Sequence, residues 1–115
     1  MSISFEGIGQ WCASFACEDV AEGMAVKLTD NGKVGKCGAG EDFCGVVAAM
    51  GRDGKACSVQ MGGFVTLPYS GDEAPVLGIC TLSADGEGGV QSAAGGWEYL
   101  AVCVDQIAKT VTIKL

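Results

Sequence analysis

The sequence predicts an all-β fold, a small β-barrel or β-sandwich with almost no helix, on three observations. Apolar and polar residues alternate wherever the chain shows any periodicity, as they do in half-buried strands. Turn-forming clusters separate these stretches, and the 115 residues include 19 glycines but only two prolines. No segment longer than about ten residues carries the 3.6-residue apolar stripe of an amphipathic helix.

Three stretches alternate most clearly. In QWCASFACED, one face of the expected strand holds every second residue: Trp11, Ala13, Phe15 and Cys17. In ACSVQM, Cys57, Val59 and Met61 share the apolar face, so Ser58 and Gln60 are expected to face solvent. In KTVTIKL, the inward residues are Val111, Ile113 and Leu115, and the outward residues are Thr110, Thr112 and Lys114.

Two further runs, Phe43–Met50 and Tyr99–Asp105, are apolar on both faces. A strand of this composition is covered on both sides, either at the centre of a sandwich or barrel or at a subunit interface. Asn31-Gly32 and Asp53-Gly54 are strong hairpin signals, because these residues tolerate the positive φ of primed turns. Gly62-Gly63 interrupts a β run and indicates a bulge or bend.

The chain also contains an internal repeat. EGMAVKLTDNGKV (residues 22–34) and LGICTLSADGEGGV (residues 77–90) share a β run, a polar turn and a closing valine. The comparison matches Leu28 with Leu82, Val34 with Val90, and Val59 with Ile113. It predicts one domain, 1–115, with pseudo-symmetric strand–hairpin units at 20–61 and 76–115 and a connector at 62–75. One unit cannot bury its apolar face alone, so the two should pack together.

Residues 1–19 fall outside this repeat and carry three of the chain's aromatic side chains, Phe5, Trp11 and Phe15. The segment is expected either to add a strand to the chain's own sheet or to reach a neighbouring molecule as an N-terminal arm. In the second case these three aromatic residues are the candidate contacts with a partner or sister subunit.

Charge and hydropathy exclude several classes of partner. The formal net charge of −7, with no cluster of Lys or Arg, disfavours nucleic acid and anionic membranes. No apolar run approaches the roughly 18–20 residues that a transmembrane helix needs. The N-terminus lacks the basic start and apolar block of a secretory signal, so we expect a protein made and kept in a cytoplasm.

The composition gives little support for a metal or redox site. The seven cysteines form no CxxC motif, and there is no histidine, so the usual zinc spacings are absent. An odd number of cysteines in an expected cytoplasmic protein argues against a disulfide framework. Four cysteines lie among Val, Ala and Ile and are expected to be small apolar core residues: Cys44, Cys57, Cys80 and Cys103. We predict no metal and no cofactor.

Catalytic signatures are also missing, so we predict no enzyme activity. A Ser or Cys nucleophile usually needs a nearby histidine as base. The carboxylates cluster in turn-like segments where solvated charge is normal. DGEGG (residues 85–89) lacks the alternate ligands of a calcium loop, and GKVGKCGAG (residues 32–40) lacks the GK[ST] ending of a phosphate loop. The first is expected to be a hairpin turn, and the second to be turn and strand.

A small acidic β protein with internal symmetry is also compatible with a biotinyl or lipoyl carrier domain. Such a domain carries a modified lysine at a hairpin tip, in a Met-Lys-Met or Asp-Lys-Ala setting. None of the six lysines has that setting: Lys27, Lys33, Lys36, Lys55, Lys109 and Lys114. A small ligand- or carbohydrate-binding β module remains a further alternative.

The order of the motifs resembles that of a known class of proteins. V-x-x-G-x-x-V-x-L-x-(D/N)-G-x-V is followed by F-x-G-V-V, GFVTLPYSG, LGICTLSADGEGGV and EYLAVCVD. This arrangement resembles the capsid decoration, or head-cement, proteins of tailed bacteriophages and prophages, although residues 1–19 and the cysteines are not features of that class. The resemblance implies a non-enzymatic virion protein on the capsid exterior, bound to the major capsid protein, with a homotrimer favoured.

Overall fold

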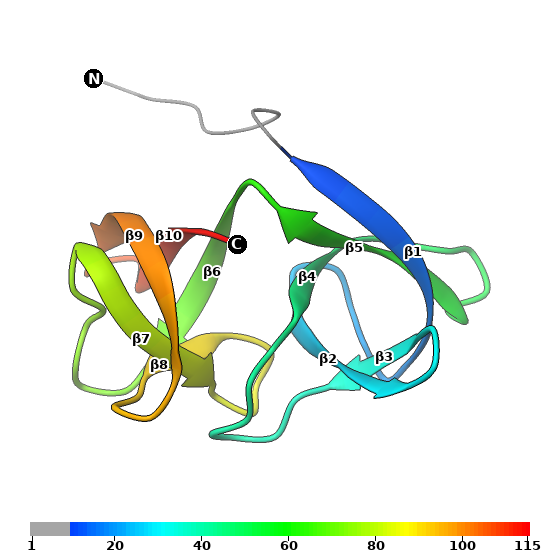
Figure 1. Cartoon of the computed structure of the whole chain (residues 1–115), viewed down its shortest axis with the longest axis horizontal. Helices are drawn as coiled ribbons and strands as arrows, with labels where there is room; N and C mark the ends of the chain where they lie inside the picture. The colour runs from blue at the N-terminus through cyan, green and yellow to red at the C-terminus, as the bar shows by residue number, and fades with distance from the viewer. Residues whose placement is uncertain (1–9) are drawn as a thin grey trace.

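The computed structural model describes residues 10–115, which form ten strands and no helix. The strands are β1 (Trp11–Glu18), β2 (Ala25–Asp30), β3 (Lys33–Lys36), β4 (Gly45–Met50), β5 (Ala56–Gly62), β6 (Phe64–Ser70), β7 (Gly78–Ala84), β8 (Val90–Ser92), β9 (Trp97–Asp105) and β10 (Thr110–Lys114). They close into two five-stranded barrels that lie side by side (Figure 1). The predicted all-β class and its two repeat units are confirmed.

Both barrels have the same topology. In the first, β1 pairs parallel with β3 and antiparallel with β5; in the second, β6 pairs parallel with β8 and antiparallel with β10. Each structural unit therefore begins one strand earlier than the units 20–61 and 76–115 that the hairpin comparison gives. β1 lies within residues 1–19, and β6 lies within the expected connector 62–75. Residues 11–18 thus form a strand of the chain's own barrel.

The strand register aligns the two units residue by residue. Val34 pairs with Cys17, and Val90 pairs with Tyr69, so Val34 and Val90 are equivalent, as predicted. Across the hairpins, however, Val34 pairs with Leu28 and Val90 with Ala84. The predicted match of Leu28 with Leu82 is therefore wrong by two residues: Leu28 is equivalent to Ala84, because the paired residues are equally far apart in both hairpins.

The core of the first barrel is built from small apolar side chains of all five of its strands. Its buried members are Cys17, Val26, Val34, Val47, Cys57 and Val59. The core of the second barrel contains the larger side chains of Leu67, Leu82 and Ile113 together with Val111. The inward orientation predicted for Val111 and Ile113 is confirmed, since both are fully buried.

The second core continues into the first barrel, which explains why β4 is apolar on both faces. Val47 packs in the core of the first barrel, whereas its neighbour Val46 belongs to the cluster centred on the second barrel. Phe43, just before β4, stacks on Tyr99 of β9 with ring centroids 5.1 Å apart and ring planes at 7°. The first part of the run, residues 43–47, therefore packs between the two barrels of one chain.

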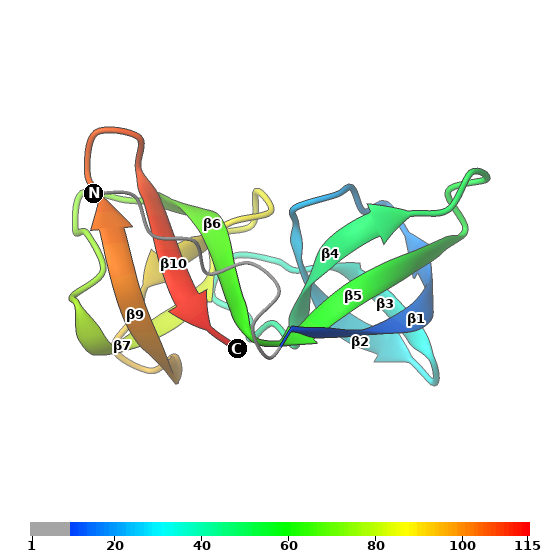
Figure 2. The same cartoon turned by 90° about the horizontal axis from the view of Figure 1, so that it is seen from above.

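Backbone hydrogen bonds also join the barrels. The loop between β3 and β4 binds the end of β7, where Gly40 N donates to Ala84 O (2.8 Å) and Ala84 N donates to Glu41 O (2.8 Å). Ala25 N donates to Gly88 O at 2.8 Å. In both Figure 1 and Figure 2 the β7–β8 segment extends toward the first barrel, as these bonds require.

Two polar residues expected on solvent faces are buried. Gln60 of β5 donates from Nε2 to Gly62 O (3.1 Å) and Phe64 O (2.8 Å), and its Oε1 accepts from Gln10 Nε2 (3.1 Å). Its amide therefore fixes the one-residue link, Gly63, between the barrels. Thr112 of β10 is buried against Thr66, with their hydroxyl oxygens 2.8 Å apart. Hydrogen bonding compensates the burial of both side chains.

Candidate interaction surface

The aromatic contact candidates of the N-terminal segment differ in exposure. Phe5 lies outside the described residues. Phe15 is half-buried and packs against the core of the first barrel, which gives it a role in folding. Trp11 is 57% exposed, and its indole covers Gly62 so closely that a Cβ there has no room. Of the two described candidates, Trp11 is the one that presents a large apolar surface to solvent.

A second apolar surface lies on the second barrel, and sequence reasoning missed it. We call Val76, Leu77, Ile79 and Leu100 the β7 face; they are 65%, 63%, 64% and 38% exposed. Ile79 of β7 pairs directly with Leu100 of β9, which places their side chains side by side. The segment before β7 lies at the end of the molecule farthest from the first barrel (Figures 1 and 2).

A groove of about 490 Å³ runs beside the β7 face. Its apolar lining includes Val76, Ile79, Ala93 and Ala94, and its lining also includes the charged residues Glu73 and Glu98. Hydrogen bonds hold its walls: Ala93 N donates to Thr81 O (3.1 Å), and Ser92 Oγ donates to Glu73 O (3.5 Å). The groove is therefore a formed feature of the barrel surface.

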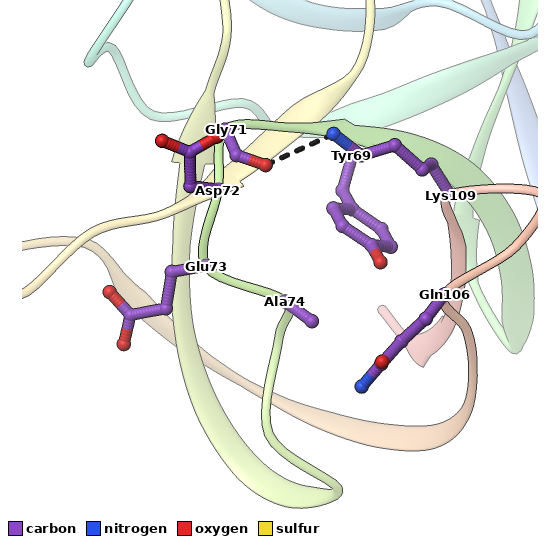
Figure 3. A pocket seen from close by; sticks show the side chains of 7 residues that line it. All are labelled: Tyr69, Gly71, Asp72, Glu73, Ala74, Gln106 and Lys109. Carbon is purple, nitrogen blue, oxygen red and sulfur yellow. Dashed lines mark hydrogen bonds between the residues drawn. The ribbon is translucent and has the colours of Figure 1, made fainter.

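A second cavity, of about 510 Å³, lies near the β9–β10 turn (Figure 3). The Lys109 Nζ donates to Gly71 O at 3.0 Å and stands 5.4 Å from the centroid of the Tyr69 ring. Figure 3 shows Ala74 and Gln106 extending toward the space beside this ring, whereas the Glu73 carboxylate points away from it. Lys109 lies at a hairpin tip, but its ammonium group is already engaged, unlike the free amine of a carrier lysine.

The glycine-rich turn at 85–89 serves the fold. Asp85 Oδ1 accepts from Glu87 N (2.7 Å) and Gly89 N (3.0 Å), and Oδ2 accepts from Ser70 Oγ (2.6 Å). Oδ1 thus closes the turn, and Oδ2 joins it to the end of β6. Gly86 and Gly88 adopt positive φ and lie against Ala39 and Met24 of the first barrel. The expected turn is present, and it also forms part of the contact between the barrels.

The other glycine-rich stretch, 32–40, forms β3 and the start of the loop that contacts the second barrel. Glu41 fixes this loop, because its carboxylate accepts from Lys27 Nζ (2.5 Å) and from Gly38 N (2.6 Å). These hydrogen bonds, first from the Lys27 ammonium and then from the Gly38 N–H, lower the pKa of the Glu41 carboxyl. The two lysines of the stretch, Lys33 and Lys36, lie in β3 and line a pocket that also contains acidic residues, where Lys33 Nζ pairs with Glu18 at 3.0 Å.

The cysteines are free thiols, and their burial only partly follows the prediction. Cys57 and Cys80 are buried as expected, and Cys44 is half-buried. Cys103 is exposed, contrary to expectation, because a bulge between β9 and β10 changes the side-chain phase of β9. Within residues 10–115, no three Cys, Asp or Glu side chains are grouped as metal ligands.

Burial shifts the titration of several of these groups. It raises the pKa of the Cys37 thiol to about 11, with Glu41 contributing, and that of Cys57 to about 11, with the Cys17 thiol contributing. Burial also raises the pKa of the Tyr99 phenol to about 12, and the negative charge of Asp42 adds to this effect. Each group is held neutral by the folded state.

These shifts predict that the protein loses stability at alkaline pH. Above pH 9 the unfolded chain releases thiol protons that the folded chain retains, so the free energy of unfolding should fall between pH 9 and 11. Urea denaturation in reducing buffer at a series of pH values measures this slope. Cys37→Ala and Cys57→Ala should each make it shallower than in wild type.

In comparisons with known proteins, no protein-family model matches the chain, and no curated protein sequence matches it. Among residues 10–115 there is no helix long and apolar enough to span a bilayer.

Proposed function

We propose that this protein is a non-enzymatic virion component that binds the outer surface of a bacteriophage capsid and stabilises the assembled shell. The observation that carries the proposal is the β7 face, where neighbouring apolar side chains stand exposed on a formed barrel surface. Contiguous exposed apolar surface marks sites of protein–protein interaction. The sequence resemblance to capsid decoration proteins supplies the class of partner, the major capsid protein.

The arrangement of the barrels supports a binding role. Only Gly63 separates β5 from β6, and the Phe43–Tyr99 stack and three backbone hydrogen bonds join the barrels elsewhere. A preorganised surface loses little conformational entropy when it binds. A protein that prefers the expanded shell to free or precursor subunits stabilises that shell by mass action.

The net charge of the molecule is compatible with a place on the outer surface of a capsid. A net charge of −7 keeps a small β protein soluble and opposes its non-specific association with nucleic acid. The resemblance favours a homotrimer, and light scattering of the purified protein measures that assembly independently of capsid binding. An intact-mass measurement on protein from the native host also tests the carrier alternative, because a lipoyl or biotinyl group would add mass to a lysine.

The direct test is co-sedimentation with expanded capsids of the parent phage. Purified protein at micromolar concentration should pellet with expanded capsids and remain in the supernatant without them. Precursor capsids of the same phage and expanded capsids of an unrelated phage are the matched controls, and both should retain less protein. Failure to pellet with the parent capsid would contradict the proposal.

A further inference from the structure

We propose that the groove beside the β7 face is the docking surface, and that its occupant is an apolar segment of the capsid protein carrying lysine or arginine. This inference rests on the proposed function and specifies the face used and the chemistry of the partner. Val76 and Ile79 are about two-thirds exposed and belong both to the β7 face and to the groove lining. Removing them from water favours association.

The charge of the groove specifies the rest of the partner. Among residues 10–115, Glu73 and Glu98 are the only charged residues that line it, and both are exposed. Neither carboxylate forms an ion pair with a cation in the described part of the chain; the ion pairs there are Lys27–Glu41 and Lys33–Glu18, both in the first barrel. Docking a neutral or acidic segment would bring these carboxylates out of water without compensation. A lysine or arginine of the partner, beside its apolar residues, compensates by pairing with the carboxylates.

The same charges argue against a second copy of this chain as the occupant. Each copy carries a net charge of −7, and a two-fold contact through this groove would bring Glu73 and Glu98 of one copy toward those of the other. Like charges across an interface weaken association. A partner segment with basic and apolar residues avoids both the unpaired burial of these carboxylates and the repulsion between like charges.

The walls of the groove are already in place. Ala93 N bonds to Thr81 O, Gly96 N bonds to Ala93 O (3.0 Å), and the Ser92 hydroxyl bonds to Glu73 O. The first two bonds hold the turn after β8 in shape and against β7, and the third joins β8 to the segment before β7. An incoming chain therefore meets a surface with a fixed shape. The cost of ordering it on binding is correspondingly small.

Paired substitutions test the apolar and the charged parts separately, with expanded capsids of the parent phage as the probe. Ile79→Asp and Glu98→Lys should each weaken co-sedimentation by about tenfold or more, as expected for a central interface residue. The matched controls are Leu28→Asp, at an exposed apolar residue of the first barrel, and Glu22→Lys, at an exposed carboxylate. Both controls should bind within about twofold of wild type. Thermal unfolding followed by circular dichroism confirms that all four variants fold.

Zero-length cross-linking identifies the occupant. A carbodiimide joins a carboxylate to a nearby amine with loss of water, so Glu73 or Glu98 should become linked to a lysine of the capsid protein in the wild-type complex. Links from these residues to a second copy of the chain, or equal binding by wild type, Ile79→Asp and Glu98→Lys, would overturn this inference and leave the proposed function standing. If the wild-type protein itself fails to pellet, both proposals fall.

Discussion

Replacing Phe43 by alanine should lower the free energy of unfolding by about 3–5 kcal/mol, the usual cost of truncating a buried phenylalanine. The side chain is 6% exposed and packs in the cluster shared by the two barrels, with its ring stacked on Tyr99. The change removes this stack and leaves a cavity in the contact between the barrels. A loss of this size is a large part of the 5–15 kcal/mol by which domains are usually stable.

Urea denaturation followed by tryptophan fluorescence measures the effect, since each barrel contains one tryptophan, Trp11 or Trp97. If Phe43 couples the barrels, the single transition of wild type should separate into two in the alanine variant. Phe43→Leu, which keeps most of the volume, should cost less than about 1.5 kcal/mol. An alanine variant as stable as wild type would show that the stack contributes little to joining the barrels.

Replacing Gly45 by alanine should destabilise the first barrel by about 1–3 kcal/mol, the typical cost of inserting a methyl group into packed structure. Gly45 is buried in β4, which lies between β2 and β5. A Cβ at this position would lie 2.6 Å from Gln60 O and 2.7 Å from Val59 Cγ1. The first atom is backbone of a paired strand, so neither strand can move away without disturbing the barrel.

Gly95→Ala is the matched control for this substitution. Gly95 is exposed, its φ is not positive, and a Cβ there meets no atom within 4 Å. The free energy of unfolding of the Gly95→Ala variant should stay within about 0.5 kcal/mol of wild type in the same urea titration. Equal stability of the two alanine variants would contradict the steric argument for Gly45.

Local patterns predicted the strands, their turns and the presence of a repeat, because side-chain alternation and turn geometry depend on neighbouring residues. These local patterns did not show at which residue each of the two repeat units begins. Gly62 and Gly63 interrupt the apolar pattern, so β6 was expected to be part of a connector, although it pairs with both β8 and β10. The predicted match of Leu28 with Leu82 failed because it assumed a two-residue difference between the hairpins, whereas the strand register gives the same spacing from Leu28 to Val34 as from Ala84 to Val90.

The interaction surface was less accessible to sequence reasoning. Ile79 lies in an apolar stretch, and only barrel closure and pairing with Leu100 determine that it faces solvent. Gln60 illustrates the opposite case, because a polar residue at an apparently outward position is buried once the following strand turns back across it. In both cases the exposure of the side chain depends on contacts between distant parts of the chain.

The contact between the barrels has a direction. The loop between β3 and β4 of the first barrel receives the β7–β8 turn of the second, whereas the corresponding β2–β3 turn, at residues 30–32, is exposed. Contacts between unlike surfaces do not close on themselves after one step, and separate copies joined in this way form rings or filaments. Within this chain the two barrels that make such a contact are joined covalently through Gly63. The two barrels therefore differ in which surfaces they leave free, despite the internal repeat. The β2–β3 turn of the first barrel is exposed, whereas the equivalent β7–β8 turn of the second packs against the first.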